Sequence, residues 1–170
     1  MSALAIYTII HVAISLVAIV SGFGFAYRLL SSRPLRGWTS TFFVTTLLTS
    51  LTGFGFPNLQ FTPGVIIGIL SLIVLTIAAV ARYVGHLQSG WRIAYVASAL
   101  IAFYFNFFVL VVQSFMKIPA LHALAPTNSE PPFAIAQLVV LVAFLVVGYF
   151  AVRRFHETPT IPTTPVTPAL

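Results

Sequence analysis

Five long apolar stretches, separated by short polar connections, make up most of the chain. A helix needs about 20 mainly apolar residues to cross roughly 30 Å of hydrocarbon, and each stretch approaches that length. The pattern therefore predicts an all-α fold, a polytopic membrane bundle of five transmembrane helices. The predicted spans are Leu4–Leu30, Trp38–Phe56, Val65–Arg82, Ile93–Met116 and Pro132–Val152.

Residues between and after the stretches predict where helices begin and where the bundle ends. Thr62-Pro63-Gly64 offers a capping hydroxyl and a proline at a first helical position, and Ser129-Glu130-Pro131 offers the same with a carboxylate. Residues 1–156 thus form one transmembrane domain. Residues 157–170 are rich in proline and threonine and have nothing to bury, which predicts a disordered cytoplasmic tail.

Composition agrees with a membrane location and excludes an ordinary soluble domain. The chain of 170 residues is 59% apolar and only 6% charged, whereas soluble domains are about 25% charged. Its net charge of +6 does not indicate nucleic-acid binding, because the basic residues sit at the ends of the spans.

The distribution of basic residues predicts how the bundle is oriented. Lys117 alone lies in an even-numbered connection, while seven arginines lie beside the odd-numbered connections or after the last span. Because cytoplasmic loops carry the excess of basic residues, the N-terminus is expected outside and the C-terminus in the cytoplasm. The seven are Arg28, Arg33, Arg36, Arg82, Arg92, Arg153 and Arg154.

Small and hydroxylic residues at helical spacing predict the inward faces of four spans. Lipid supplies no hydrophobic force between helices, so they associate by close packing and interhelical hydrogen bonds. Most of the 16 phenylalanines are expected to face lipid. The expected inward faces are His11, Ser15, Ala18, Gly22 and Ala26; Thr41, Thr45 and Thr49; Gly64 and Gly68; and Ser98, Ala102, Asn106, Gln113 and Lys117.

Polar residues that are energetically unfavourable in hydrocarbon lie in the outer half of the predicted bundle, mainly between Ile93 and Gln137. Unpaired amide or imidazole groups cost several kcal/mol in hydrocarbon, so these side chains should turn inward. They are either hydrogen-bonded glue between helices or a pocket for a ligand, and residues 118–125 could lie over it as a short interfacial helix. The candidate ligand-binding residues are His11, Asn106, Gln113, Lys117, His122, Glu130 and Gln137.

Two redox cofactors are alternatives for the same region. The four histidines sort into an outer pair, His11 with His122, and an inner pair, His86 with His156, and a b-type haem needs two axial imidazoles at one depth. The aromatic residues around Asn106 would offer stacking surfaces to a quinone. Only His11 lies inside a predicted span.

Residue types that the chain lacks exclude several kinds of enzyme. There is no cysteine and no aspartate, and the only acids are Glu130 and Glu157. A thiolate nucleophile, an iron–sulfur cluster, a Ser-His-Asp triad and a carboxylate-held magnesium ion are therefore excluded, and no metal site is expected. The sequence favours a non-enzymatic protein.

Four stretches together resemble a family of small bacterial multi-pass membrane proteins. They are Pro34-Leu35-Arg36-Gly37-Trp38, Thr52-Gly53-Phe54-Gly55-Phe56-Pro57, Ala81-Arg82-Tyr83-Val84 and residues 118–132. The resemblance implies a bacterial cytoplasmic (inner) membrane and no particular activity.

The sequence thus predicts a membrane protein that binds or passes a small apolar or amphipathic molecule, or that serves as an accessory subunit of a membrane complex. The alternatives are a b-haem or quinone redox protein and a small transporter or channel. Expected partners are membrane lipids, with other subunits or further copies of the chain, and no nucleic acid.

Overall fold

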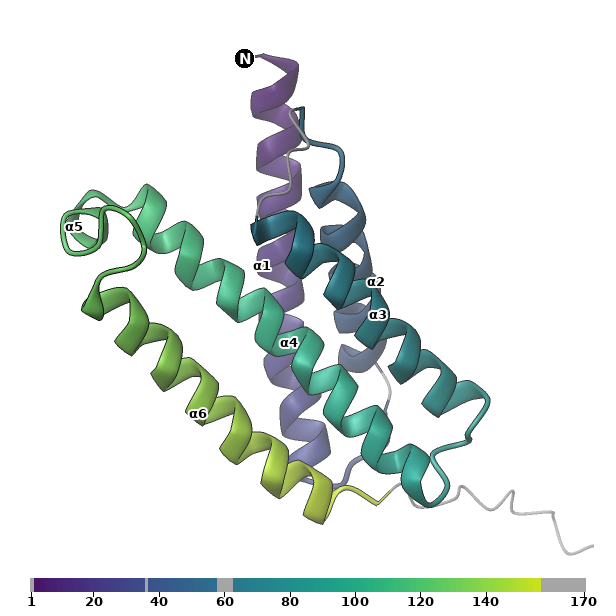
Figure 1. Ribbon diagram of the computed structural model, residues 1–170. Helices are drawn as coiled ribbons and strands as arrows, with labels where there is room; N and C mark the ends of the chain where they lie inside the picture. The colour runs from purple at the N-terminus through teal and green to yellow at the C-terminus, as the bar shows by residue number, and fades with distance from the viewer. Residues whose placement is uncertain (1, 36, 58–62, 157–170) are drawn as a thin grey trace, which may run out of the picture.

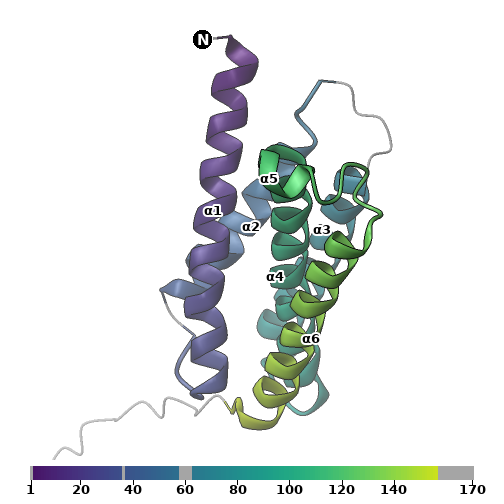
Figure 2. The same cartoon turned by 90° about the vertical axis from the view of Figure 1, so that its left-hand side faces the viewer.

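The computed structural model describes residues 2–35, 37–57 and 63–156, and every regular element in these ranges is helical. Successive long helices alternate in direction, so the start of the first and the end of the last lie at opposite ends of the bundle (Figures 1 and 2). The predicted tail, residues 157–170, lies outside the described residues. The helices are α1 (Ala3–Leu30), α2 (Trp38–Gly53), α3 (Pro63–Tyr83), α4 (Gly90–Lys117), α5 (Pro119–His122) and α6 (Pro131–Arg154).

Four of the described helices are long and apolar enough to cross a membrane: α1, α3, α4 and α6. They mark the chain as a membrane-embedded helical protein. The second predicted span is shorter than expected, because α2 has 16 residues and turns away at Phe54. At 1.5 Å per residue, α2 is about 24 Å long, which falls short of the hydrocarbon core of a typical bilayer.

The predicted prolines lie where helices begin, whereas the predicted capping residue Thr62 lies outside the described residues. Pro63 is the first residue of α3, and Pro131 is the first residue of α6, where its missing N–H costs nothing. Glu130 is the N-cap residue of α6, but its carboxylate does not cap that helix. Ile118 separates α4 from α5, so the connection predicted as an interfacial helix contains a single helical turn.

α4 is the centre of the bundle, since it contacts each of the other five described helices. It is also the most buried of the four candidate spans. In an apolar stretch of 18 residues within each helix, 39% of the residues are buried in α4, against 11% in α1 and 6% in α6. Burial on α1 is confined to its second half, from Ala18 to Leu29. Accordingly, α1 approaches α4 and α6 near its C-terminal end and stands apart from them near its N-terminus (Figure 2).

Aromatic rings make up much of the core, although most of the described phenylalanines are half-buried and keep part of their surface available to lipid. Of the described phenylalanines, only Phe23 and Phe150 are exposed. Phe25 stacks on Phe42 with centroids 5.1 Å apart, and Phe43 stacks on Tyr95 at 5.9 Å. Few hydrogen bonds join the helices, and aromatic rings fill the space between them. Each ring pair stabilises the fold by about 0.5–1.5 kcal/mol beyond the burial of its surface.

The small-residue face predicted for α1 is confirmed, whereas the face predicted for α2 is wrong. Ala18, Gly22 and Ala26 are all buried. On α2, however, Thr41 is exposed and Thr45 and Thr49 are half-buried. Because Phe42 stacks on the core ring of α1, the residues that share its side of the helix become the inward face: Thr39, Thr46 and Ser50.

Candidate functional site

His11 joins the N-terminal half of α1 to the end of α2. Its Nδ1 lies 2.7 Å from the Thr52 hydroxyl, and the Tyr7 hydroxyl, one turn earlier, donates to the Thr52 carbonyl at 2.6 Å. The rings of Tyr7 and His11 both pack edge-on against Phe56, at 5.0 and 5.2 Å. His11 is therefore part of a hydrogen-bonded and aromatic contact between two helices.

Asn106 lies at the middle of α4 and bonds to α2. Its Nδ2 donates to the Thr46 hydroxyl at 3.0 Å, and Thr46 is fully buried. This bond lies within the aromatic core, since Phe103 and Phe107, on the same helix, pack against each other at 5.5 Å. Asn106 thus links two helices.

Gln137 connects α6 to α4 and has one atom unsatisfied. Its Nε2 donates to the Phe108 carbonyl at 3.2 Å, while its Oε1 is buried and accepts no hydrogen bond within the described part of the chain. Reversing the amide would place its oxygen against the Phe108 carbonyl oxygen, which is unfavourable. A buried acceptor without a partner costs roughly 1–3 kcal/mol, so this position calls for a donor.

Gln113, Lys117 and His122 lie on the surface of the structure. Gln113 is exposed on α4, Lys117 is exposed at the end of the same helix, and His122 is exposed on α5. Lys117, in the last turn of α4, is suited to the negative end of the helix dipole.

Glu130 closes its own loop before α6. Its carboxylate oxygens accept from the backbone N–H of Thr127 at 3.2 Å, the Thr127 hydroxyl at 2.9 Å and the backbone N–H of Ser129 at 3.1 Å. Partial desolvation would raise the pKa of this carboxyl. The hydrogen bonds from Thr127 and Ser129 outweigh that effect, so the pKa of Glu130 is lowered below its ordinary value.

Replacing Glu130 with glutamine is expected to loosen this loop at neutral pH. Because the folded-state pKa is depressed, the carboxylate stabilises the loop above its unfolded pKa, and this stabilisation is lost as the pH falls through the folded pKa. Amide hydrogen exchange at Thr127 and Ser129 would measure this stabilisation. Exchange should be faster in Glu130→Gln than in wild type at neutral pH, and the two proteins should exchange at the same rate in acid. Equal exchange at neutral pH would contradict the account.

The seven predicted residues occupy separate places. Within the described ranges no hydrogen bond joins two of them: His11 bonds to α2, Asn106 to another part of α2, and Gln137 to α4. Their ligand-binding role stays a prediction. No group of three or more potential metal ligands occurs among the described residues.

Sequence reasoning missed a second role of the arginines, which it used only for orientation. Arg92 donates to the carbonyls of Val152 and Phe155, at 2.8 and 2.5 Å, and so satisfies acceptors at the end of α6. Arg82 donates to the Leu35 carbonyl at 3.1 Å and lies 5.9 Å from the centre of the Tyr95 ring. These guanidinium groups fasten the connections at one end of the bundle.

Comparisons with protein-family models, with curated proteins and with solved structures gave no match to this chain. Its function must therefore be argued from its own residues.

Proposed function

We propose that the protein is a non-enzymatic accessory subunit of a membrane complex in the bacterial cytoplasmic membrane. The supporting observation is how the polar side chains of its helices are used. His11, Asn106 and Gln137 each bond to a neighbouring helix. Such bonds typically contribute about 0.6 kcal/mol each and hold helices in register. The few polar side chains within the helices thus hold the bundle together.

The faces available to a partner are those that the bundle leaves uncovered. α6 has one buried residue, Ala151, and α1 has none before Ala18. Val139 and Val146, two turns apart on α6, are 62% and 50% exposed. Lipid can cover such surfaces, but a helix that packs against α4 and α1 on one side and is uncovered on the other is also where another subunit can pack.

The proposed arrangement in the membrane keeps five crossings, with the N-terminus outside. α2 connects the arginine-rich end of the bundle to the opposite end, as a crossing segment would (Figure 1). A short span is tolerated where the bilayer thins or neighbouring helices shield its ends. The arginines beside the odd-numbered connections support a cytoplasmic location for that end.

Binding of a small molecule is a second candidate, favoured by the unpaired Oε1 of Gln137. The oxygen requires a donor, so a molecule carrying a hydroxyl group, such as a quinol, would suit it. A quinone presents only acceptors and would not satisfy this atom.

The mass of the complex that contains this chain in its native membrane tests the accessory role. We expect native mass spectrometry of nanodiscs extracted from that membrane to show the 18.4 kDa chain with a stoichiometric partner. Val139→Trp with Val146→Trp should release the partner without changing thermal stability. Ile66→Trp, at a 47% exposed position on α3, is the matched control.

Other outcomes would contradict the accessory role. A single chain, or copies of this chain alone, would overturn it. A single chain carrying a small molecule that is lost in Gln137→Leu would establish the second candidate instead.

A further inference from the structure

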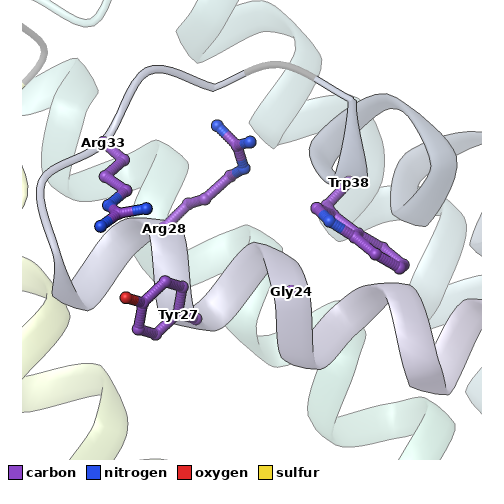
Figure 3. A pocket seen from close by; sticks show the side chains of 5 residues that line it. All are labelled: Gly24, Tyr27, Arg28, Arg33 and Trp38. Carbon is purple, nitrogen blue, oxygen red and sulfur yellow. The ribbon is translucent and has the colours of Figure 1, made fainter.

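A small hollow lies at the arginine-rich end of the bundle, between the last turns of α1 and the start of α2 (Figure 3). Its volume is about 160 Å³. At roughly 30 Å³ per water molecule, this is the space of a few waters, and it is smaller than the 300 Å³ or so at which drug-sized sites begin. The lining residues are Gly24, Tyr27, Arg28, Arg33 and Trp38.

Two guanidinium groups give the hollow its charge. Arg28 is half-buried and donates through Nη1 to the Pro34 carbonyl at 2.5 Å, which leaves its other N–H groups available. Arg33 is exposed, with its guanidinium carbon 5.4 Å from the centre of the Tyr27 ring. Glu130, the only acid among the described residues, lies at the other end of the bundle, so no described carboxylate neutralises this pair.

Two aromatic side chains, Tyr27 on α1 and Trp38 on α2, shape the wall of the hollow. A Cβ atom on Gly24 would lie 2.8 Å from Cγ of Trp38, so the glycine allows the indole to lie directly against α1. Figure 3 shows the Trp38 ring beside Gly24 and the Arg33 side chain reaching toward Tyr27. Tryptophan and tyrosine favour the membrane–water boundary, where lipid headgroups lie.

We propose that this hollow binds a phosphate group, carried by an anionic membrane lipid. Planar guanidinium groups match phosphate oxygens through paired N–H donors, and basic pockets between membrane helices accept lipid headgroups. Trp38 is the first residue of α2, so the positive end of that helix dipole lies at the same place. The volume admits the phosphate and leaves the acyl chains on the apolar surface outside.

Lipid binding to the full chain tests this site. The protein is placed in phosphatidylcholine nanodiscs with an increasing share of phosphatidylglycerol, and bound lipid is measured by native mass spectrometry. We expect Arg28→Gln with Arg33→Gln to weaken phosphatidylglycerol binding by about tenfold or more, as expected for lost charge-assisted hydrogen bonds. Arg33→Gln alone should retain the fold and lose part of the binding, because Arg33 is exposed.

The matched control removes the same charge from the same end of the molecule. Arg153 and Arg154 are both exposed, and each lies over an aromatic ring, at 4.6 and 5.4 Å. Arg153→Gln with Arg154→Gln should keep phosphatidylglycerol binding. If this control loses as much binding as the Arg28 and Arg33 variants, or if those variants bind as wild type does, the site is overturned.

A second arm distinguishes the two sources of phosphate. Inorganic phosphate is titrated onto the protein in nanodiscs that contain phosphatidylcholine alone. Phosphatidylglycerol binding without phosphate binding establishes a lipid site. The alternative outcome is that inorganic phosphate binds, competes with the lipid and requires Arg28 and Arg33. That result would support a phosphate site and would contradict the proposal that a lipid must carry the phosphate.

Discussion

Gly22→Ala is expected to push α1 away from α4 and to cost roughly 3 kcal/mol of unfolding free energy, the upper end of the usual cost of overpacking. A Cβ atom on Gly22 would lie 2.2 Å from Cε2 of Phe103, far inside van der Waals contact. Phe103 cannot yield, because it is 2% exposed and four rings surround it at 5.0–5.6 Å: Phe23, Phe42, Phe107 and Phe144. Thermal or denaturant unfolding in mild detergent would measure the loss.

Gly148→Ala is the matched control for that substitution. Gly148 also lies within a long helix, but a Cβ there would meet only Leu100 Cδ1, at an ordinary 3.9 Å. Alanine also has the higher helix propensity, so stability should be unchanged or slightly raised. Equal losses in the two variants would show that close packing of α1 on α4 is not what holds them.

Tyr95→Ala should also destabilise the protein strongly, by roughly 3 kcal/mol. The Tyr95 side chain is completely buried, stacks on Phe43 and packs against Phe25 and Phe155 at 6.3 and 6.4 Å. Its removal leaves a cavity where α1, α2 and the end of α6 meet α4. The melting temperature of the purified protein would report the change.

Two variants separate the ring from the hydroxyl group of this tyrosine. Tyr95→Phe keeps the ring and removes the oxygen that lies 3.5 Å from Nη1 of Arg82, so a loss of about 1 kcal/mol is expected. Tyr149→Ala removes a tyrosine that is 53% exposed on α6 and should cost less than about 1 kcal/mol. If Tyr95→Ala is no worse than Tyr149→Ala, the aromatic cluster does not stabilise the bundle.

Helix positions were predictable because their cause is local. Apolar length and the prolines at positions 63 and 131 depend on neighbouring residues only, and α3 and α6 begin there. The end of α2 was not predictable in this way. Gly53, Phe54 and Gly55 read as apolar continuation, yet the chain turns there, where an added Cβ at position 55 would run into the Tyr7 hydroxyl.

The candidate site was predicted as residue types and not as an arrangement. Hydrocarbon penalises unpaired polar groups wherever they lie, so the sequence correctly marked His11, Asn106 and Gln137 as inward-turning residues. Which neighbour each one bonds to depends on how the helices are rotated. That rotation placed Thr46 and Thr52 opposite Asn106 and His11, and it left Gln113 on the surface.

By itself the sequence determined that this protein is helical and apolar enough for a membrane, and that its arginines gather at one end, because composition and spacing decide these properties. Tertiary structure decided the rest. Aromatic rings pack only where neighbouring helices leave room for them, as Gly22 does for Phe103. This packing fixed the rotation of α2, so that Phe42 and Thr46 face inward. It also brought Arg28 and Arg33 to one hollow beside Trp38, where the chain turns from α1 into α2.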